Sequence, residues 1–483
     1  MSVSTSGHWI DGGEVSSPVT FDVLDPATGD VVARASRGGA PEVDAAIRSA
    51  RGAFRGPWSR LDGRDRAALL FQLARLIERD RPRLRVLLSR ENGKPLHLSD
   101  HELSTAIRYC EYYGSWADKI GGRQIPVPGP YLAYTLREPL GVVALIVPWN
   151  YPVDILLRGL APALAAGNTV VAKPAEDTPL TTVEIGRLCT EAGFPAGVFN
   201  VVTGLGPEAG AALTAHPGIQ GISFCGSAQT GVAVAQSASA HLVPVLSLEL
   251  GGKCPSLVLP DGDAEGAART IAGGMVYNAG QSCVARSRLL IHRPQVARVE
   301  AVLKECLEPV TLGPGVEDPD MGPLINGKQW NAVTQACRTA EAQGARVAHR
   351  GEVPNHLPPG RFLGPTVFSD VVSTMDLARQ EVFGPVIAVM PYDTEEEGIA
   401  LANDTEYGLA AELWTASPAK AHGVAQRLNA SHITINGSGG FGIEVPFGGV
   451  GRSGYGREGG EEGLLQYTRV KSIYLGIDRG EQR

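Results

Sequence analysis

The chain has 483 residues and a formal net charge of -8. This acidic balance, with no basic run interleaved with aromatic residues, gives no general attraction to phosphate backbones or anionic membranes, so nucleic acid and membrane surfaces are poor candidates for partners. Hydrophobic residues make up 43% and charged residues 19%, which is ordinary usage for a folded protein and excludes extensive disorder.

The length predicts two large lobes or more. Residues 1–12 lack a charged start followed by an apolar stretch, so no secretory signal is expected, and the longest apolar run, near residues 140–149, is too short to span a bilayer. Seven cysteines, odd in number and without a Cys-x-x-Cys pair, favour reduced thiols over a disulfide frame or a zinc site. We therefore expect a cytoplasmic protein without a structural metal.

The N-terminal part predicts a short strand region followed by packed helices. Apolar residues recur at helical spacing between 43 and 54 and again between 69 and 77. Asp80 is predicted to cap a further helix that begins near Pro82 and ends at Gly93, because proline is tolerated in a first turn and glycine ends helices at little cost.

From Gly141 onward, short β-branched runs alternate with helical stretches. The runs cover residues 142–147, 169–172, 198–202, 219–224 and 243–248. This alternation predicts a parallel sheet with right-handed crossovers. In such a sheet, ligands lie beyond the carboxyl ends of the strands.

The residues that follow these runs carry chemistry. In chain order they are Trp149 and Asn150, Lys173 and Glu176, Gly204 and Gly206, Gly226 and Ser227, and Glu249. One edge of the sheet therefore collects an amide, a lysine, two carboxylates and several glycines, which together suit a nucleotide and a reaction centre.

The chain after Gly251 predicts a second lobe, with strands at 288–291 and 432–435, and the loop 278–283 is expected to face the first lobe. Two further segments, 121–137 and 466–475, alternate apolar and polar residues. They are either strands of a subunit contact or a surface hairpin and tail, and the pattern does not separate these alternatives.

Cys283 is the candidate nucleophile, and small neighbours would let a carbonyl approach its sulfur. A cysteine taken alone is more often a buried small hydrophobe. The hypothesis gains support from Glu249 and Asn150, because a thiol needs a base for its proton and for water, and a donor for the oxyanion. Burial between leucines would raise the pKa of Glu249 towards that of a general base, whereas the alternative is a carboxylate paired with Lys253.

The segment from Gly226 to Gly231 follows a strand and precedes a helix, so its backbone N–H groups could hold a pyrophosphate. The signal is weak by itself because the Gly-x-Gly-x-x-Gly pattern is absent. Lys173 and Glu176 can bind adenosine ribose hydroxyls, and a carboxylate there would repel a 2′-phosphate. NAD is therefore favoured as cofactor, with NADP as the alternative.

Six segments resemble the aldehyde dehydrogenase superfamily in order and approximate spacing, over nearly the entire chain. They are Pro148-Trp149-Asn150-Tyr151-Pro152, Lys173-Pro174-Ala175-Glu176, Glu249-Leu250-Gly251-Gly252-Lys253, Gly280-Gln281-Ser282-Cys283, Glu381-Val382-Phe383-Gly384-Pro385 and Pro446-Phe447-Gly448-Gly449. The sequence departs from the family pattern at Cys225, where threonine is usual, and at Gly451, which replaces a common lysine.

The resemblance implies an α/β fold with three parts. These are a Rossmann-type parallel-sheet cofactor domain (1–120 and 140–251), an α/β catalytic domain (252–452) and a small β oligomerisation element (121–139 and 466–478). It also implies a homodimer or homotetramer that acts on a small-molecule aldehyde.

The resemblance further implies a cofactor site that places Glu381 on the nicotinamide ribose and Phe383 beside the nicotinamide. The cofactor-binding residues expected in all are Ile146, Pro148, Trp149, Lys173, Glu176, Gly206, Gly226, Ser227, Gly231, Leu250, Glu381 and Phe383. In the implied reaction, Cys283 attacks the aldehyde to give a thiohemiacetal that is oxidised to a thioester, and water activated by Glu249 releases the acid.

Four residues correspond to positions that line the family's aldehyde tunnel: Tyr151, Arg158, Phe441 and Phe447. Many members carry tryptophan in place of Arg158, and arginine recurs in relatives that act on succinic semialdehyde and on some aromatic aldehydes. A guanidinium could bind a substrate carboxylate bidentately, or it could form a structural salt bridge. A semialdehyde or an aromatic aldehyde is therefore an expected substrate.

Two competing functions stay open at this point. A cofactor-free thiol hydrolase of esters, amides or nitriles could use Cys283 with Glu249 and Lys253, but it has no need of a nucleotide-shaped strand edge. A noncatalytic binding protein would have no use for Asn150, Glu249, Cys283 and Glu381 together. His97 and His101, four apart on a predicted helix, are expected to lie on a solvated face because no further ligand cluster is evident.

Overall fold

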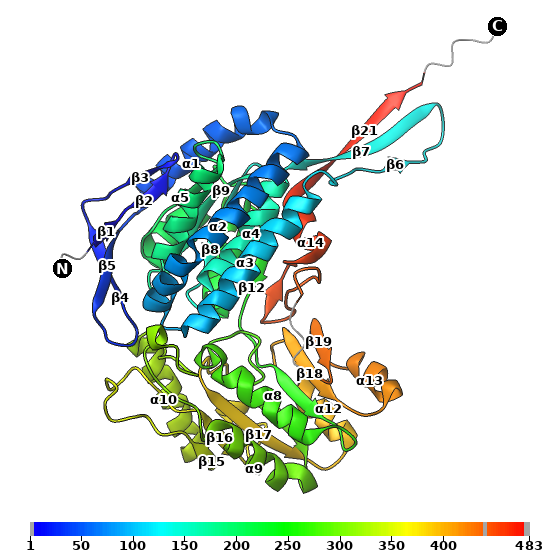
Figure 1. The fold of residues 1–483 in the computed structure, drawn as a ribbon. Coiled ribbons are helices and arrows are strands. Elements are labelled where there is room, and N and C mark those ends of the chain that lie inside the picture. The colour runs from blue at the N-terminus through cyan, green and yellow to red at the C-terminus, as the bar shows by residue number, and fades with distance from the viewer. Residues whose placement is uncertain (1–3, 438–441, 478–483) are drawn as a thin grey trace.

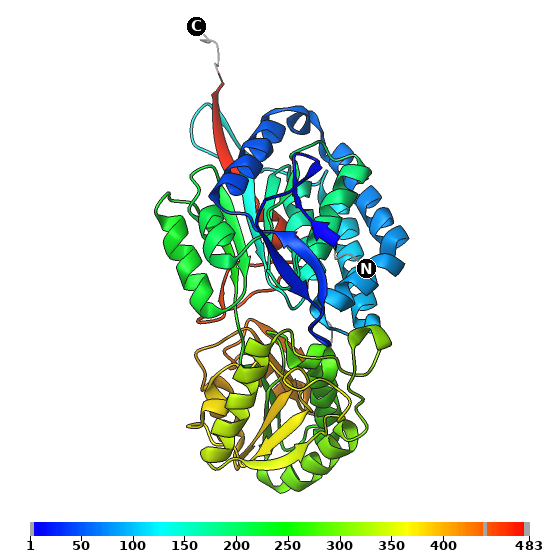
Figure 2. The ribbon, with the colours of Figure 1, turned by 90° about the vertical axis from the view of Figure 1, so that its left-hand side faces the viewer.

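The structure, a computed structural model, describes residues 4–437 and 442–477. In this part of the chain two α/β lobes stand one above the other, and a narrow β arm projects from the first lobe (Figure 1). Seen from the side, each lobe has a sheet with helices packed around it (Figure 2). The predicted α/β fold with parallel sheets is confirmed.

The first lobe is built on an eight-stranded sheet. Its strand order is β20-β12-β11-β8-β9-β10-β2-β3. The strands are β2 (His8–Ile10), β3 (Gly13–Val15), β8 (Val142–Val147), β9 (Thr169–Pro174), β10 (Phe199–Val201), β11 (Gly221–Cys225), β12 (Val245–Glu249) and β20 (Gly454–Tyr455). The five central strands are parallel. They coincide, to within two residues at each end, with the five β-branched runs.

Helices cover both faces of this sheet because its strands are apolar on both sides. Val143, Leu145 and Val147 pack into one core with α2 (Gly63–Asn92), α3 (Leu96–Trp116), α4 (Pro152–Ala165) and α5 (Leu180–Ala192). Val142 and Ala144 face the opposite core, with α1 (Ala40–Arg55), α6 (Ala211–Thr214) and α7 (Ala228–Ser239). The first sheet is therefore doubly wound, with helices on both of its faces.

The prediction of a separate helix that begins near Pro82 is wrong. The helix α2 runs without interruption from Gly63 to Asn92, with Pro82 inside it, and Asp62 caps its start. Buried leucines continue along one side of α2 past Pro82, so core packing outweighs the lost backbone hydrogen bond. Asp80 caps nothing and instead forms ion pairs with arginine side chains. The predicted end of the helix at Gly93, which has φ of 89°, is confirmed.

The second lobe is built on a seven-stranded sheet of order β15-β16-β17-β14-β13-β18-β19, parallel except for the β15–β16 pair. The strands are β13 (Pro255–Val258), β14 (Arg288–His292), β15 (Arg346–Arg350), β16 (Thr366–Ser369), β17 (Val386–Tyr392), β18 (Ala410–Trp414) and β19 (His432–Ile435). The helices are α8 (Ala264–Val276), α9 (Val296–Leu307), α10 (Gly327–Ala342), α11 (Asp376–Arg379), α12 (Glu395–Asn403) and α13 (Pro418–Ala425).

The arm is a three-stranded antiparallel sheet. It consists of β6 (Gln124–Ile125), β7 (Tyr131–Pro139) and β21 (Thr468–Gly476), with β21 paired along the full length of β7. The helix α14 (Gly460–Leu465) precedes β21. A further small sheet, formed by β1 (Ser4–Ser6), β4 (Thr20–Leu24) and β5 (Val31–Ser36), lies at the N-terminal side.

The topology brings two sets of loops together between the lobes. The chain leaves the first sheet at Glu249 and enters the second at Pro255, so the carboxyl ends of the first sheet's strands face the amino ends of the second sheet's strands.

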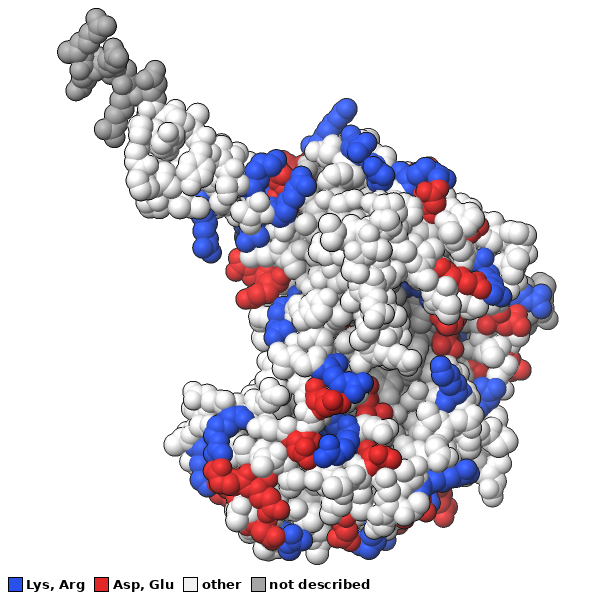
Figure 3. Space-filling model, turned by 180° about the vertical axis from the view of Figure 1, so that it is seen from behind, with Lys and Arg blue, Asp and Glu red and all other residues white. Residues whose placement is uncertain are grey.

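The face in Figure 3 carries basic and acidic side chains interspersed rather than in one large area of a single sign. Within the described residues, no helix has the length and apolar character needed to cross a membrane.

Candidate active site

The loop that carries Cys283 lies between α8 and β14, at the amino end of the second sheet. Three consecutive residues, 278–280, lie in the left-handed region, with φ between 50° and 68°. A Cβ on Gly280 would come within 2.3 Å of the backbone oxygen of Gly384, so a larger residue does not fit there without movement. The left-handed backbone conformation costs on the order of 1 kcal/mol at each non-glycine residue, and it is typical of functional sites.

Asn150 joins the first lobe to this loop. It follows β8, is buried, and its Nδ2 donates to the backbone oxygen of Gln281 at 3.2 Å. In turn, Nδ2 of Asn278 donates to the backbone oxygen of Asn150 at 3.1 Å. The structure therefore brings the predicted oxyanion donor and the predicted nucleophile together on two facing loops.

A buried ion pair supports Asn150 from behind. Lys94 and Glu102 form a hydrogen-bonded salt bridge in which each side chain is 1% exposed. Lys94 Nζ also donates to the backbone oxygen of Asn150 at 2.8 Å. Glu102 Oε1 accepts the backbone N–H groups of Val153 (2.8 Å) and Asp154 (3.2 Å) in the first turn of α4. This pair therefore fixes both the Asn150 loop and the start of α4.

Glu249 ends β12, lies in register with Cys225, and is 2% exposed. Burial raises the pKa of Glu249 well above its usual range, and the nearby Glu458 raises it further. Neither carboxylate oxygen has a hydrogen-bond partner among the described residues, and the same holds for Lys253 Nζ. The alternative of a Glu249–Lys253 pair is therefore absent from the described part of the structure.

The ionisation of Cys283 depends on its neighbours. Burial raises the pKa of the thiol to about 12. The positive charge of Arg158 lowers this pKa, and the negative charges of Glu381 and Glu249 raise it further. The sulfur is therefore protonated at neutral pH, and it needs a proton acceptor to become a nucleophile.

Lys173 and Glu176 lie together after β9. Lys173 is buried, and its Nζ donates to Glu176 Oε2 at 3.2 Å. Burial lowers the pKa of Lys173, and Glu176 partly offsets this effect. An amine and a carboxylate side by side form a donor and acceptor set that suits the two hydroxyls of a ribose.

The turn between β11 and α7 has an open backbone at the start of a helix. Ser227 caps α7, with its Oγ accepting from the N–H of Thr230 at 3.3 Å. A Cβ on Gly231 would come within 2.7 Å of Leu250 Cδ2, so glycine lets α7 pack closely on the end of β12. Close approach of a backbone and the N-terminus of a helix suit a pyrophosphate.

Glu381 and Phe383 lie in the loop before β17, opposite the first sheet. Glu381 Oε1 accepts the N–H of Gly252 at 2.9 Å, and burial raises the pKa of Glu381 to about 7. Phe383 contacts Trp149 edge-to-face, with ring centroids 5.3 Å apart. Of the other expected cofactor residues, Ile146 and Pro148 lie at the end of β8, Gly226 follows β11 and Gly206 begins the short helix 206–210.

The expected substrate residues lie around α4. Tyr151 precedes α4 and stacks on Tyr277, with centroids 6.2 Å apart. Arg158 Nε lies 2.5 Å from Glu458 Oε2, and its Cζ lies 5.2 Å from the centroid of the Phe447 ring. Phe441 lies outside the described residues. The salt bridge offered as an alternative for Arg158 is thus present in the structure.

A family model described as "Aldehyde dehydrogenase family" matches residues 13–473. The chain belongs to the aldehyde dehydrogenase family. Among curated relatives, this aldehyde dehydrogenase is similar to hydroxyisobutyraldehyde dehydrogenase of Mycolicibacterium austroafricanum, 43% identical over 98% of this chain and 93% of that protein. It is also similar to mitochondrial aldehyde dehydrogenase of Equus caballus, 39% identical over 95% of this chain and 93% of that protein.

Solved structures extend the likeness to cofactor-bound enzymes. The NAD+ complex of an aldehyde dehydrogenase from Bacillus cereus has a TM-score of 0.95, with 41% identity, 98% of this chain covered and 97% of that one. Betaine aldehyde dehydrogenase from Staphylococcus aureus, in complex with NAD+, has a TM-score of 0.95, with 35% identity and coverage of 99% and 96%. This aldehyde dehydrogenase is an NAD-dependent enzyme that oxidises aldehydes, as expected, and the cofactor-free hydrolase is not favoured.

Some charged residues near the site of this aldehyde dehydrogenase were not predicted from the sequence. Four charged residues are buried or half-buried beside the site: Lys94, Glu102, Asp154 and Glu458. A charge on the apolar face of a predicted helix, such as Glu102 in α3, was the one available signal. Among the cysteines near the site, Cys254 is buried, whereas Cys225 is half-buried at the end of β11, in register with Glu249.

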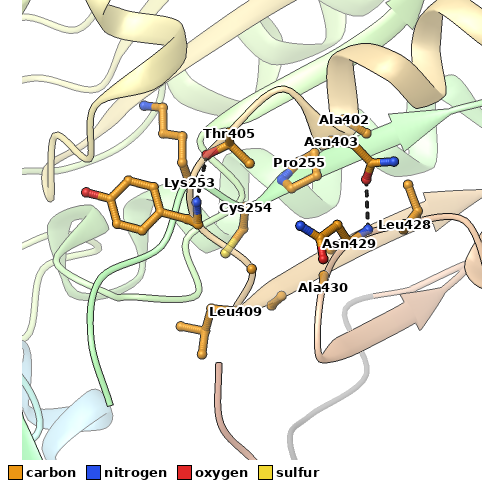
Figure 4. Close-up of a pocket in the computed structure, with 14 residues that line it drawn as sticks. Lys253, Cys254, Pro255, Ala402, Asn403, Thr405, Leu409, Leu428, Asn429 and Ala430 are labelled. Carbon is orange, nitrogen blue, oxygen red and sulfur yellow. Dashed lines mark hydrogen bonds between the residues drawn. The ribbon is translucent and has the colours of Figure 1, made fainter. Parts of the chain in front are cut away.

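A small cavity behind Cys254 does not belong to the proposed catalytic centre. It holds about 10 Å³, close to the room of a single water molecule, and lies among Lys253, Cys254, Pro255 and residues around Asn403 and Asn429 (Figure 4). Among the residues that line this cavity, only Lys253 was a candidate catalytic residue of the alternative thiol hydrolase. His97 is exposed and its Nδ1 contacts Asp318, and no group of three or more metal-ligating side chains occurs among the residues described.

Proposed function

We propose that Cys283 is the nucleophile of this enzyme, that Asn150 is the side-chain donor to the oxyanion, and that Glu249 is the general base. The observation that carries the proposal is the Glu249 carboxyl group. It is buried, and both of its oxygens lack a hydrogen-bond partner within residues 4–437 and 442–477. The segment that follows it contacts the Cys283 loop, because a Cβ on Gly252 would come within 2.3 Å of the backbone oxygen of Cys283. A buried carboxylate without hydrogen-bond partners destabilises the folded protein, and such groups are typical of catalytic sites.

The reaction follows from the chemistry of these groups. The Cys283 thiol loses its proton to solvent, its sulfur attacks the aldehyde carbon, and the Asn150 amide and the Cys283 N–H donate to the resulting oxyanion. NAD supplies the hydride acceptor when bound. The oxidised carbon stays on Cys283 as a thioester until water, deprotonated by Glu249, attacks it and releases the acid.

For the cofactor, we assign Lys173 and Glu176 to the adenosine ribose, the turn at Gly226 and Ser227 to the pyrophosphate, and Glu381 to the nicotinamide ribose. The amine and carboxylate pair and the capped start of α7 support these roles. Residues 1–120 with 140–251 would then form the NAD-binding domain and 252–452 the catalytic domain. Seven free cysteines support a cytoplasmic location.

Replacement of the oxyanion donor tests the proposal. In Asn150→Ala, kcat/KM for any aldehyde is expected to fall about 100- to 1000-fold, because one hydrogen bond to the oxyanion is lost. Steady-state NADH formation measures this loss, and quenching of protein fluorescence by NADH should remain because the cofactor residues are intact.

The matched control is Asn355→Ala, the same substitution at an exposed loop position, which should leave kcat/KM unchanged. A kcat/KM for Asn150→Ala within a factor of three of the wild-type value would contradict the role of Asn150.

We also propose that the arm, residues 121–139 with 466–478, joins subunits into a homodimer or homotetramer. Tyr131, Leu136, Val470, Tyr474 and Leu475 are exposed on it, and its outer part shows few charges in Figure 3. A protruding apolar sheet is costly in water unless another surface covers it.

Charged substitution on the arm should therefore separate the subunits. Val470→Asp with Tyr474→Asp is expected to shift the sedimentation coefficient to that of a 50.8 kDa monomer. The same two changes at exposed positions elsewhere, Val353→Asp with Tyr455→Asp, serve as the control. An unchanged coefficient in the arm variant, or a monomeric wild type, would contradict this role.

A further inference from the structure

Helix α4 has one open face inside a lobe that otherwise buries it. Asp154 and Arg158 are the two residues of α4 that are not buried. They are four residues apart, so their side chains emerge on the same side of the helix. Tyr151, just before α4, and Tyr277, at the start of the Cys283 loop, are also half-buried.

The positive charge on this face is already engaged. Glu458, which pairs with Arg158, is itself fixed, because Ser223 and Ser247 each donate a hydroxyl to its Oε1 at 2.9 Å. The two partners are 11% and 3% exposed on their side chains. A substrate carboxylate would have to displace Glu458 and to lie near a second acid, Asp154, so the face does not favour anions.

Asp154 keeps an acceptor that the protein does not use. Its Oδ1 is buried without a hydrogen-bond partner among the described residues. The start of α4 does not need it, because Glu102 already accepts the N–H groups there. Burial raises the pKa of Asp154 to about 6, with Arg158 and Lys94 lowering it and Glu102 and Glu458 raising it, so the carboxyl group is largely ionised at neutral pH. A buried anionic oxygen without a donor is costly unless a ligand supplies one.

This face adjoins the reacting sulfur. Arg158 Cζ lies 5.2 Å from the centroid of the Phe447 ring, and Phe447 belongs to the apolar cluster against which Cys283 packs. Tyr151, just before α4, stacks on Tyr277, which begins the Cys283 loop. The unused acceptor of Asp154, on the same face of α4 as Arg158, therefore lies on the side of the helix that borders the Cys283 loop.

Building on the proposed function, we propose that Asp154 selects the substrate by accepting a hydrogen bond from a hydroxyl group of a neutral hydroxyaldehyde. Arg158, held by Glu458, does not recruit an acid-bearing aldehyde. A hydroxyl supplies the missing donor, whereas an ammonium group would meet the charge of Arg158 and a carboxylate would meet Glu458 and Asp154.

Selectivity between isosteric aldehydes tests the proposal. Three pairs exchange a hydroxyl for a methyl group: 2-hydroxy-2-methylpropanal with 2,2-dimethylpropanal, 3-hydroxybutanal with 3-methylbutanal, and 6-hydroxyhexanal with heptanal. For each pair, the ratio of kcat/KM values is measured in wild type, Asp154→Leu and Asp154→Asn. Comparison of ratios between variants cancels the intrinsic reactivity of each aldehyde and any general loss of activity.

We expect at least one pair in which the wild type favours the hydroxyaldehyde and Asp154→Leu reduces that preference about 10-fold or more, the usual scale of a hydrogen bond to a charged group. Asp154→Asn should lie between the two, because an amide oxygen still accepts but a neutral bond is weaker. Asp118→Leu, the same change at an exposed position, should keep the wild-type ratios.

Three results would overturn the proposal: equal ratios in wild type and Asp154→Leu for every pair, a preference for succinic semialdehyde over pentanal that Arg158→Gln abolishes, or a preference for 3-aminopropanal over butanal that Asp154→Leu abolishes. In each case the plain aldehydes would still release NADH through Cys283. Failure of the specificity is thus distinct from failure of the mechanism, in which no aldehyde would be oxidised through that thiol.

Discussion

Cys283→Ala loses NADH production with every aldehyde, by a factor expected to be at least about 10⁴, because no other group can form the covalent bond to the substrate. The two nearest thiols are not placed to replace it. Cys254 is 1% exposed, with its Sγ donating to the backbone oxygen of Cys283 at 3.5 Å, and Cys225 lies at the end of β11 in the first lobe. Steady-state absorbance of NADH measures the loss.

The matched control for this experiment is Cys306→Ala, the same substitution at a half-buried position on α9, which should keep wild-type activity. Quenching of protein fluorescence by NADH should persist in both variants, since neither removes a cofactor contact. Steady turnover by Cys283→Ala at even a tenth of the wild-type rate would rule out the covalent mechanism.

Glu249→Gln separates the two halves of the reaction. The amide preserves the size of the side chain but cannot take a proton from water, so the variant is expected to release about one NADH per subunit in a rapid burst and then stall. The steady rate should be about 10²- to 10⁴-fold below wild type, the usual contribution of a general base. Mass spectrometry of the stalled enzyme should find the acyl group on the peptide that contains Cys283.

The pH dependence follows from the burial of Glu249. Its pKa is raised, so the basic form accumulates only as pH rises through that value, and steady turnover of the wild type should fall as pH is lowered through the same range. In Glu249→Gln this dependence should disappear. Glu444→Gln, on an exposed ion pair, is the control. Full steady turnover by Glu249→Gln, or a stall with no burst, would be incompatible with the proposed base.

The five parallel strands of the first sheet were predictable because burial on both faces requires continuous β-branched runs, as in Val142–Val147. The same local logic failed at Pro82. A proline in a first turn and a proline inside a long helix have the same sequence signature, and the buried leucines on both sides decided between them.

The chemistry of the site was visible along the chain, but its supporting charges were not. Trp149, Asn150 and Glu249 follow recognisable strands, so topology alone predicts that they share an edge. Lys94 lies in the turn between α2 and α3 and Glu102 lies on α3, so their contact with the Asn150 loop depends on how α2, α3 and α4 pack.

The amino-acid sequence by itself determined the α/β class, the family, and the types of residue available for thiol chemistry beside NAD, because these depend on periodicity and on motifs within short segments. Only the tertiary structure decided that Arg158 forms an ion pair with Glu458 and that Asp154 Oδ1 has no hydrogen-bond partner among the described residues. Such pairings depend on distances between segments hundreds of residues apart, and the desolvation that sets their energies exists only once the lobes have folded.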